Sequence, residues 1–549
     1  MASEKVVSKS PSVTDFASSP ASDDAESLGA APKVFTTKRG LAGRHVQLMS
    51  IGGSIGTGLF VGIGSSLRSS GPLSVVLAYI VYCTTFIFHA NMAVGEMAAY
   101  LPIRGSVFEF ASRYVDPALG FGLGWTYFYA SSMLVCAEMS AVATVMGFWL
   151  PDTNAAAWIA MSLGVCLLLN VFAVKYYGET EFIFACTKIL LLVGLVLLTF
   201  ITMLGGNPKN DRYGFRYWGN GNAMHEYMDT GVTGRFLGWW KVVLYAAFSV
   251  SGPDLIALAA GEMIDPRRNI PRVARRAFWR IAGFYIVGVF AVGIICSSRD
   301  ERLLGAIDGG QVGSAASPWV IGIQNLGIQG LPSLINVLIL LSGWSCGNAF
   351  LYSSSRTLYS LALDGQAPKF FLKCTQSGVP IHAVLTVGLL SCITFLVASS
   401  SATEVLSWFI NLCTIGFVVS YTCFLITYIG WFNALRAQGI SRDTLPFKAP
   451  FMPYAAYFGV GTGCVVVLFA GFNTFKPFDT QGFVTSYFGV VFAIIMFTFW
   501  KFYKKTEFVK PENADLFTGK AEVDEECKIW EQPGAPKTKG WAKFWDELW

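Results

Sequence analysis

The chain has 549 residues, of which 53% are hydrophobic and only 14% are charged, and its formal net charge is +5. Soluble proteins carry about 25% charged residues, so this composition excludes an ordinary soluble chain. No basic patch with interleaved aromatic residues occurs, which excludes nucleic acid as a partner.

The first 44 residues are rich in Ser, Ala, Pro, Asp and Lys and contain no apolar run. We predict that residues 1–44 form a disordered tail. Because no apolar segment precedes a cleavage site, this tail is not a signal peptide. The first membrane helix is therefore expected to direct insertion.

Apolar segments then recur along the chain, each near the length of about 20 residues that crosses a bilayer. They are expected near residues 46–66, 72–100, 118–150, 156–174, 181–205, 236–262, 278–297, 331–356, 381–400, 404–431, 454–474 and 484–503. The sequence thus predicts an all-α integral membrane protein of about twelve transmembrane helices. Residues 504–549 turn polar again and are predicted to form a C-terminal tail.

Lysine and arginine are unevenly distributed between the connections. They are frequent in both tails and after the predicted helices 6, 8 and 10, and sparse in most of the connections on the other side. The densest group is Arg267, Arg268, Arg272, Arg275, Arg276 and Arg280. Since positive residues stay on the cytoplasmic side, both termini are predicted to be cytoplasmic.

Two of the predicted helices carry residues that break helices. Helix 1 contains Gly52-Gly53-Ser54-Ile55-Gly56-Thr57-Gly58, and each glycine costs roughly 1 kcal/mol relative to alanine. Helix 6 contains Pro253 in Ser249–Asp254, where proline removes a backbone donor. Breaks at matching places predict a five-plus-five inverted-repeat transporter core over residues 45–430. Helices 11 and 12, within residues 431–503, would lie outside that core.

Interrupted backbone in a membrane survives where it lines a cavity or is buried in protein. Amide groups freed at a break would hold a carboxylate, and freed carbonyls would hold an ammonium group, so an amino acid zwitterion fits such a site. Close helix packing through small residues is the alternative interpretation of the glycines. A phosphate-binding loop is excluded because G-x-x-x-x-G-K-[ST] is not matched.

Ionisable residues inside apolar spans are costly to insert and are functional candidates. Glu138, Lys188 and Asp254 are the coupling candidates, because a buried lysine or carboxylate can exchange a proton during transport. Glu96, Glu109 and Glu262 are instead expected to form salt bridges with arginines near the inner surface. No activated nucleophile, metal-binding set or cofactor motif occurs, so neither an enzyme nor a cofactor or metal is predicted.

The chain resembles the fungal amino acid permease family, a branch of the amino acid–polyamine–organocation superfamily. The motifs that carry this resemblance are Arg44-His45-Val46, Ile51–Phe60, Gly95–Pro102, Gly178-Glu179 with Glu181, Ala260–Glu262 with Pro266–Pro271, Ser355–Tyr359 with Gly365–Pro368, and Phe517–Lys520. They span nearly all of the chain outside the tails.

The resemblance implies proton-coupled uptake of amino acids across the plasma membrane. By position, the substrate site would comprise Ile55, Gly56, Thr57, Gly58, Phe248, Val250 and Ser251. Lys188 matches a lysine that takes the place of a sodium ion in sodium-independent relatives. The tail lysines would accept ubiquitin in endocytic control by a ubiquitin ligase.

The chain departs from the family pattern in two places. Gly252-Pro253-Asp254 stands where Gly-Thr/Ser-Glu is usual, which puts the substrate range and the coupling role of this position in doubt. The chain ends in Glu547-Leu548-Trp549 instead of Phe-Trp-Cys, so palmitoylation there is not expected. A carrier of proline, polyamine or another organic cation, and a non-transporting amino acid sensor, remain alternatives.

Overall fold

The structure, a computed structural model, describes residues 43–103, 106–150, 152–171, 174–219, 221–250, 253–308, 317–398 and 402–531. Residues 1–42 of the predicted N-terminal tail and residues 532–549 of the C-terminal tail lie outside the described ranges.

Helices make up almost the whole of the described chain. In order, they are α1 (Gly43–Ser54), η2 (Thr57–Leu59), α2 (Ile63–Ser70), α3 (Pro72–Tyr82), η3 (Cys83–Ile87), α4 (Phe88–Tyr100), α5 (Ser106–Tyr114), α6 (Pro117–Met146), α7 (Ala155–Val171), α8 (Val174–Met203), η4 (Arg216–Trp218), α9 (Gly231–Ser249), α10 (Pro253–Ala260), α11 (Pro266–Ile295), α12 (Glu301–Asp308), α13 (Pro318–Asn325), α14 (Leu331–Leu363), η6 (Lys369–Leu372), α15 (Ile381–Ser391), η7 (Cys392–Ala398), α16 (Ala402–Ala437), η8 (Arg442–Thr444), α17 (Tyr454–Leu468), η9 (Phe472–Thr474), α18 (Thr480–Lys504), η10 (Pro511–Asn513) and α19 (Lys520–Glu531).

Each predicted membrane span overlaps one or more helices of the described chain. Within the described residues, eight runs are long and apolar enough to cross a bilayer: α3 to α4, α6, α8, α11, α14, α16, α17 to η9, and α18. The pair from α1 to α2 adds a span bent by 46°, and α7 and α15 are shorter apolar helices. Together, α9 and α10 occupy the remaining predicted position. One boundary differs, because α16 continues to Ala437 and so runs past the predicted end of the core at residue 430.

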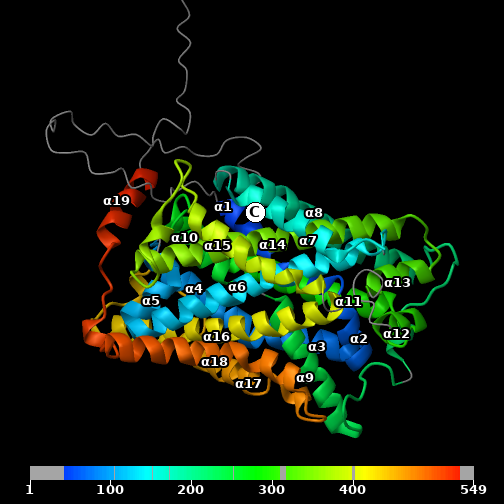
Figure 1. The fold of residues 1–549 in the computed structure, drawn as a ribbon. Helices are drawn as coiled ribbons and strands as arrows, with labels where there is room; N and C mark the ends of the chain where they lie inside the picture. The colour runs from blue at the N-terminus through cyan, green and yellow to red at the C-terminus, as the bar shows by residue number, and fades with distance from the viewer. Residues whose placement is uncertain are drawn as a thin grey trace, which may run out of the picture.

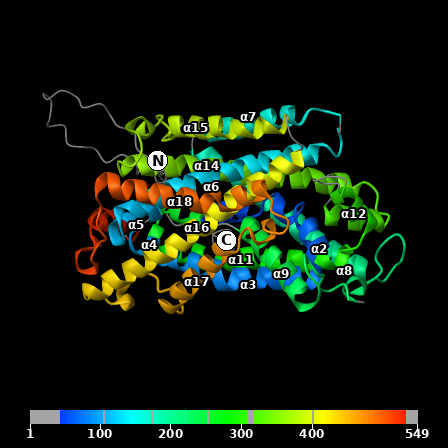
Figure 2. The same cartoon turned by 60° about the horizontal axis from the view of Figure 1, so that its bottom comes forward.

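The helices run side by side along one direction (Figure 1). The short helices α5, α10 and α19 lie at one end, which we call the α5 end, and α12 and α13 lie at the other. Figure 2 shows α7 and α15 together along one side and α3 and α17 along the opposite side. Of the most apolar 18-residue stretch of α6, 89% is buried inside the protein, whereas 11% of the corresponding stretch of α18 is buried. Thus α6 is central, and α18 presents its apolar side chains to lipid.

The described part of the C-terminal tail packs across the α5 end. The Val509 amide donates to the Val115 carbonyl over 2.8 Å, and the Gln438 side-chain amide donates to the Ala514 carbonyl over 2.7 Å. Leu516 is fully buried, and Asp524 of α19 pairs with Arg267. The sequence predicted a polar tail here but gave no sign that it would contact the helix bundle.

Three predicted salt bridges are confirmed at the α5 end. Glu96 accepts hydrogen bonds from Arg442 Nε at 2.8 Å, from Tyr428 at 2.9 Å and from the Ala449 amide at 3.0 Å. Glu109 pairs with Arg113 within α5. Glu262 accepts from Arg356 Nε at 3.0 Å and from the Tyr352 hydroxyl at 2.6 Å, which joins the end of α10 to α14. Two of these ion pairs therefore tie the α5 ends of α4, α10 and α14 to neighbouring segments.

Glu96→Gln should destabilise the protein strongly. Glu96 is fully buried and Arg442 mostly so, hence the neutral side chain leaves a guanidinium without its counter-charge. Removing one partner of a buried pair costs about 3–5 kcal/mol. The check is the thermal unfolding midpoint of the purified protein in detergent. Asp443→Asn is the matched control, because its ion pair with Lys448 is largely exposed and contributes about 0–1 kcal/mol. Equal midpoints for the two variants would contradict the prediction.

Candidate functional site

The first predicted break is present. Helix α1 ends at Ser54, Ile55 and Gly56 are not helical, and the chain resumes as η2 and α2 at an angle of 46° to α1. Gly56 is extended, with φ −102° and ψ −154°. Ile55 and Thr57 are buried, so the interruption lies inside the protein, as interrupted backbone in a membrane requires.

Side chains from neighbouring helices satisfy the carbonyls before the break. Lys188 of α8 donates to the Gly52 carbonyl, and Tyr285 of α11 donates to the Ser54 carbonyl. On α14, Cys346 Sγ lies 3.0 Å from the Gly53 carbonyl and Ser342 Oγ lies 3.1 Å from the Ile55 carbonyl. Four consecutive carbonyls are thus held by three other helices. Acceptors that an ammonium group could use are concentrated here.

The freed amide after the break faces a carboxylate. The Thr57 amide lies 3.3 Å from both oxygens of Glu138, and the Thr57 hydroxyl donates to Oε2 over 2.9 Å. Backbone amides at the start of a helical segment favour a negative group, both through hydrogen bonds and through the helix dipole. The start of η2 is therefore a carboxylate-binding position, and the protein's own Glu138 occupies it.

The second break lies against the first. Helix α9 ends at Ser249, Val250 is extended, and α10 begins at Pro253. The Tyr285 hydroxyl contacts the Ser249 carbonyl as well as the Ser54 carbonyl, so one side chain links both breaks. Tyr79 is stacked on Tyr285 with ring centroids 5.7 Å apart, and its hydroxyl is 2.7 Å from Ser249 Oγ.

Lys188 is the cation of a buried polar network. Its side chain is 1% exposed, and its electrostatic neighbours include Glu138 and Glu181, which are 2% and 0% exposed. Glu181 accepts a hydrogen bond from Ser345 at 2.6 Å and lies 3.5 Å from the Asn348 amide nitrogen. Two buried carboxylates and one buried ammonium lie beside the break in helix 1. Such a cluster can hold or release a proton within the membrane.

Two of the glycines are explained by these carboxylates. A Cβ atom on Gly52 would collide with Glu181 Oε1, and one on Gly56 would collide with Glu138 Oε1 and lie 2.9 Å from Cys346 Sγ. Gly52 lies in the last turn of α1, whereas Gly56 lies in the break itself. The sequence left a substrate-binding interruption and close packing as alternative interpretations of the glycines, and at Gly56 the helix interruption and a close side-chain approach occur together.

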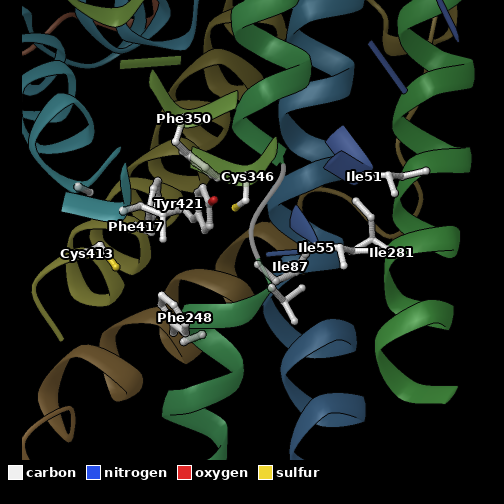
Figure 3. Close-up of a cluster of buried hydrophobic side chains, with 14 of the residues drawn as sticks. Ile51, Ile55, Ile87, Phe248, Ile281, Cys346, Phe350, Cys413, Phe417 and Tyr421 are labelled. Atoms are coloured by element: carbon white, nitrogen blue, oxygen red, sulfur yellow. The ribbon is translucent and has the colours of Figure 1, made fainter. Parts of the chain in front are cut away.

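Aromatic side chains from three spans border the same region. Phe417 of α16 lies 5.5 Å from Phe350, 5.7 Å from Tyr127 and 5.9 Å from Tyr421, between ring centroids. Figure 3 shows Phe350, Phe417 and Tyr421 grouped on one side of Cys346, with Ile55 on its other side. Phe248 of α9 lies below them in this view. The polar backbone groups of the breaks thus lie near a group of apolar, aromatic side chains.

The structure brings most of the predicted site residues together. Ile55, Gly56, Thr57 and Gly58 lie at the first break, and Phe248 and Val250 lie at the second. A Cβ on Gly58 would be 3.2 Å from Phe248 Cε1. Glu138 and Lys188 lie beside the first break. Ser251 falls outside the described residues, and Asp254 lies in α10 with a side chain that is likewise outside them.

Sequence reasoning missed Glu181, Ser345, Asn348 and Tyr285 as members of the site. A signal existed for Glu181, which precedes Lys188 by seven residues, or about two helical turns, and therefore lies on the same face of α8. No comparable pattern marks Tyr285, because its role depends on which helix packs beside it.

Comparison with known proteins places this arrangement in a family. The amino acid permease family model matches residues 45–512. The chain belongs to the amino acid permease family.

The permease is 43% identical to a proline-specific permease of Emericella nidulans over 90% of each chain. It is 42% identical to a probable proline-specific permease of Schizosaccharomyces pombe over 86% of each chain. It is also 37% identical to a dicarboxylic amino acid permease of Saccharomyces cerevisiae, over 89% of this chain and 81% of that one. This permease is accordingly a multi-span membrane protein that transports amino acids.

Proposed function

We propose that this permease takes up amino acids together with protons across the plasma membrane, with both termini in the cytoplasm. The orientation rests on the arginines and lysines of the α5 end, where the start of α11 alone carries Arg267, Arg268, Arg272, Arg275 and Arg276. Positive residues are retained on the cytoplasmic side of a membrane. The α5 end is then the inner end.

In this proposal, spans 1–5 and 6–10 form two inverted five-helix repeats, and the substrate binds between the two breaks. Ile55, Gly56, Thr57 and Gly58 would contact it from one repeat, and Phe248, Val250 and Ser251 from the other. The observation that carries the proposal is the carboxylate of Glu138 on the Thr57 amide and hydroxyl. A substrate carboxylate would use the same donors, and its ammonium group would use carbonyls at the ends of α1 and α9.

Proton coupling follows from competition for Thr57. While Glu138 is charged, it holds the donors that the substrate carboxylate needs. A proton on Glu138 weakens its hold on those donors, so protonation favours substrate binding, and substrate binding favours protonation. Lys188 would set the charge balance of this exchange together with Asp254. The proton and the substrate would therefore load together.

The test is uptake of radiolabelled amino acids by a yeast strain that lacks its own amino acid permeases. Expression of this chain should give uptake that rises several-fold from pH 7 to pH 5 and falls to background when a protonophore collapses the proton gradient. A transport-negative chain of equal surface abundance is the control. Uptake that ignores the protonophore would overturn proton coupling, while absence of uptake for any amino acid would overturn transport.

Proline is the substrate that we propose to test first. Two of the relatives above carry proline-specific names, and a proline-specific permease of Saccharomyces cerevisiae is 38% identical over 93% of this chain. Unlabelled proline should compete with labelled proline, whereas a polyamine, which lacks a carboxylate, should not. Equal competition by many amino acids would indicate a general permease instead.

Control of the permease by ubiquitin-dependent endocytosis is also part of this proposal. Lys528 of α19 is exposed on the described part of the C-terminal tail, where a ubiquitin ligase would reach it.

A further inference from the structure

The start of α11 carries a basic cavity that none of the residues at the two breaks lines. The cavity has a volume of about 550 Å³, and among the described residues it is lined by Arg272, Arg275, Arg276, Trp279 and Arg280. These positions follow one another at intervals of three, one, three and one, so all five side chains lie on one face of the helix.

Four guanidinium groups around one cavity form a site for an anion with several charged oxygens. Arginine binds phosphate groups through paired hydrogen bonds. Among the described charged groups that act on Arg272, three are arginines, Arg268, Arg275 and Arg276, and one is an acid, Asp265. The buried acids Glu96 and Glu262 of this end are already paired with Arg442 and Arg356. A bound polyanion would relieve the mutual repulsion of the arginines.

Trp279 indicates that the anion belongs to a lipid. Its side chain is 66% exposed, and beyond it on α11 the exposed large side chains are the apolar Val287 and Phe290. Tryptophan is enriched at the level of lipid headgroups. The cavity therefore lies at the boundary where arginines face the headgroups and the rest of the helix faces the acyl chains.

We propose that this cavity binds the headgroup of an anionic phospholipid of the cytoplasmic leaflet that carries more than one phosphate, as phosphorylated inositol lipids do. The assignment to that leaflet uses the orientation given under the proposed function, but the binding site does not depend on amino acid transport. Clusters of basic residues next to a membrane helix bind such lipids.

The headgroup would act on the transport site through α1. Arg280 donates to the Gln47 side chain over 3.0 Å, and Gln47 lies on α1 between its start and the first break. A lipid phosphate on Arg280 would hold α11 and the inner half of α1 in a fixed relation.

The test uses the full-length purified chain in nanodiscs of neutral lipid with or without a few per cent of phosphatidylinositol bisphosphate, with binding measured by native mass spectrometry. The variant Arg272→Gln/Arg275→Gln removes two exposed arginines. Since each interfacial basic residue is worth about a fivefold change in affinity, binding should weaken roughly 25-fold. The matched control is Lys369→Gln/Lys373→Gln, which removes two exposed positive charges elsewhere at the α5 end.

The site would be overturned if both double variants weakened lipid binding equally, because the lipid would then respond to total charge. It would also be overturned if neither variant weakened binding, because the lipid would then bind elsewhere. Tight binding of soluble inositol trisphosphate, at an affinity equal to that of the lipid, would overturn the lipid assignment. Should the double variant fail to fold, a photoreactive bisphosphate lipid on the wild-type chain must label residues of α11; labelling confined to other helices would overturn the proposal. Failure of the chain to transport any amino acid would leave lipid binding unchanged.

Discussion

The variant Lys188→Met is expected to lower proton-driven accumulation of substrate to less than about one hundredth of the wild-type level. Lys188 is the only cation among the described side chains of the network that holds Glu138 and Glu181. Breaking a buried charge pair costs about 3–5 kcal/mol, enough for a change of more than a hundredfold. Without Lys188, both carboxylates are expected to take up protons and remain neutral, because an unpaired charge cannot stay buried. A proton could then no longer be exchanged with the substrate.

Substrate accumulation is measured at pH 5 and at pH 7, and each value is divided by the surface abundance of the fluorescently tagged chain. Lys241→Met is the matched control: this lysine also lies within a span, but its ammonium rests over the Tyr227 ring at 4.3 Å, away from the breaks. If Lys188→Met does not reach the surface, the double variant Lys188→Met/Glu181→Gln, which has one carboxylate fewer, should. Wild-type accumulation by either variant would show that Lys188 has no part in coupling.

Gly56→Ala is expected to lower uptake strongly while leaving the chain in the membrane. The added methyl group would collide with Glu138 Oε1 and lie 2.9 Å from Cys346 Sγ. Relief requires Glu138 to leave the Thr57 amide or helix 1 to shift from α14. Either change costs about 1–3 kcal/mol and displaces the groups proposed to bind the substrate. Since such displacement affects both loading and closure, we expect a loss of at least about tenfold in uptake.

Gly164→Ala provides the control, because a Cβ at Gly164 in α7 meets nothing within 4 Å. In an open helix position, alanine stabilises relative to glycine by about 1 kcal/mol, so this variant should transport normally. Kinetics should separate the effects: Gly56→Ala should raise KM for the amino acid as well as lower the maximal rate. Normal KM in Gly56→Ala would mean that the first break does not contact the substrate.

The sequence by itself determined the membrane architecture. Runs of about 20 apolar residues are expected to be helical in a bilayer, since no water is present to satisfy the backbone, and each predicted span overlaps helix in the described chain. The breaks were predictable for a local reason as well. Gly52 to Gly58 and Pro253 disfavour continuous helix whatever surrounds them. The type of partner of the acids at the α5 end was also predictable, because a buried carboxylate there needs an arginine.

Only the tertiary structure decided which groups meet at the breaks. Glu138 reaches Thr57 because α14 packs against both α6 and η2, and Tyr285 contacts both breaks because α11 packs against both α1 and α10. The tail across the α5 end has the same origin: Leu516 is buried by contacts with segments several hundred residues earlier in the chain. Spacing along one helix reports which residues share a face. It carries no information on which neighbouring helix that face will touch, since side-chain packing between helices sets that choice.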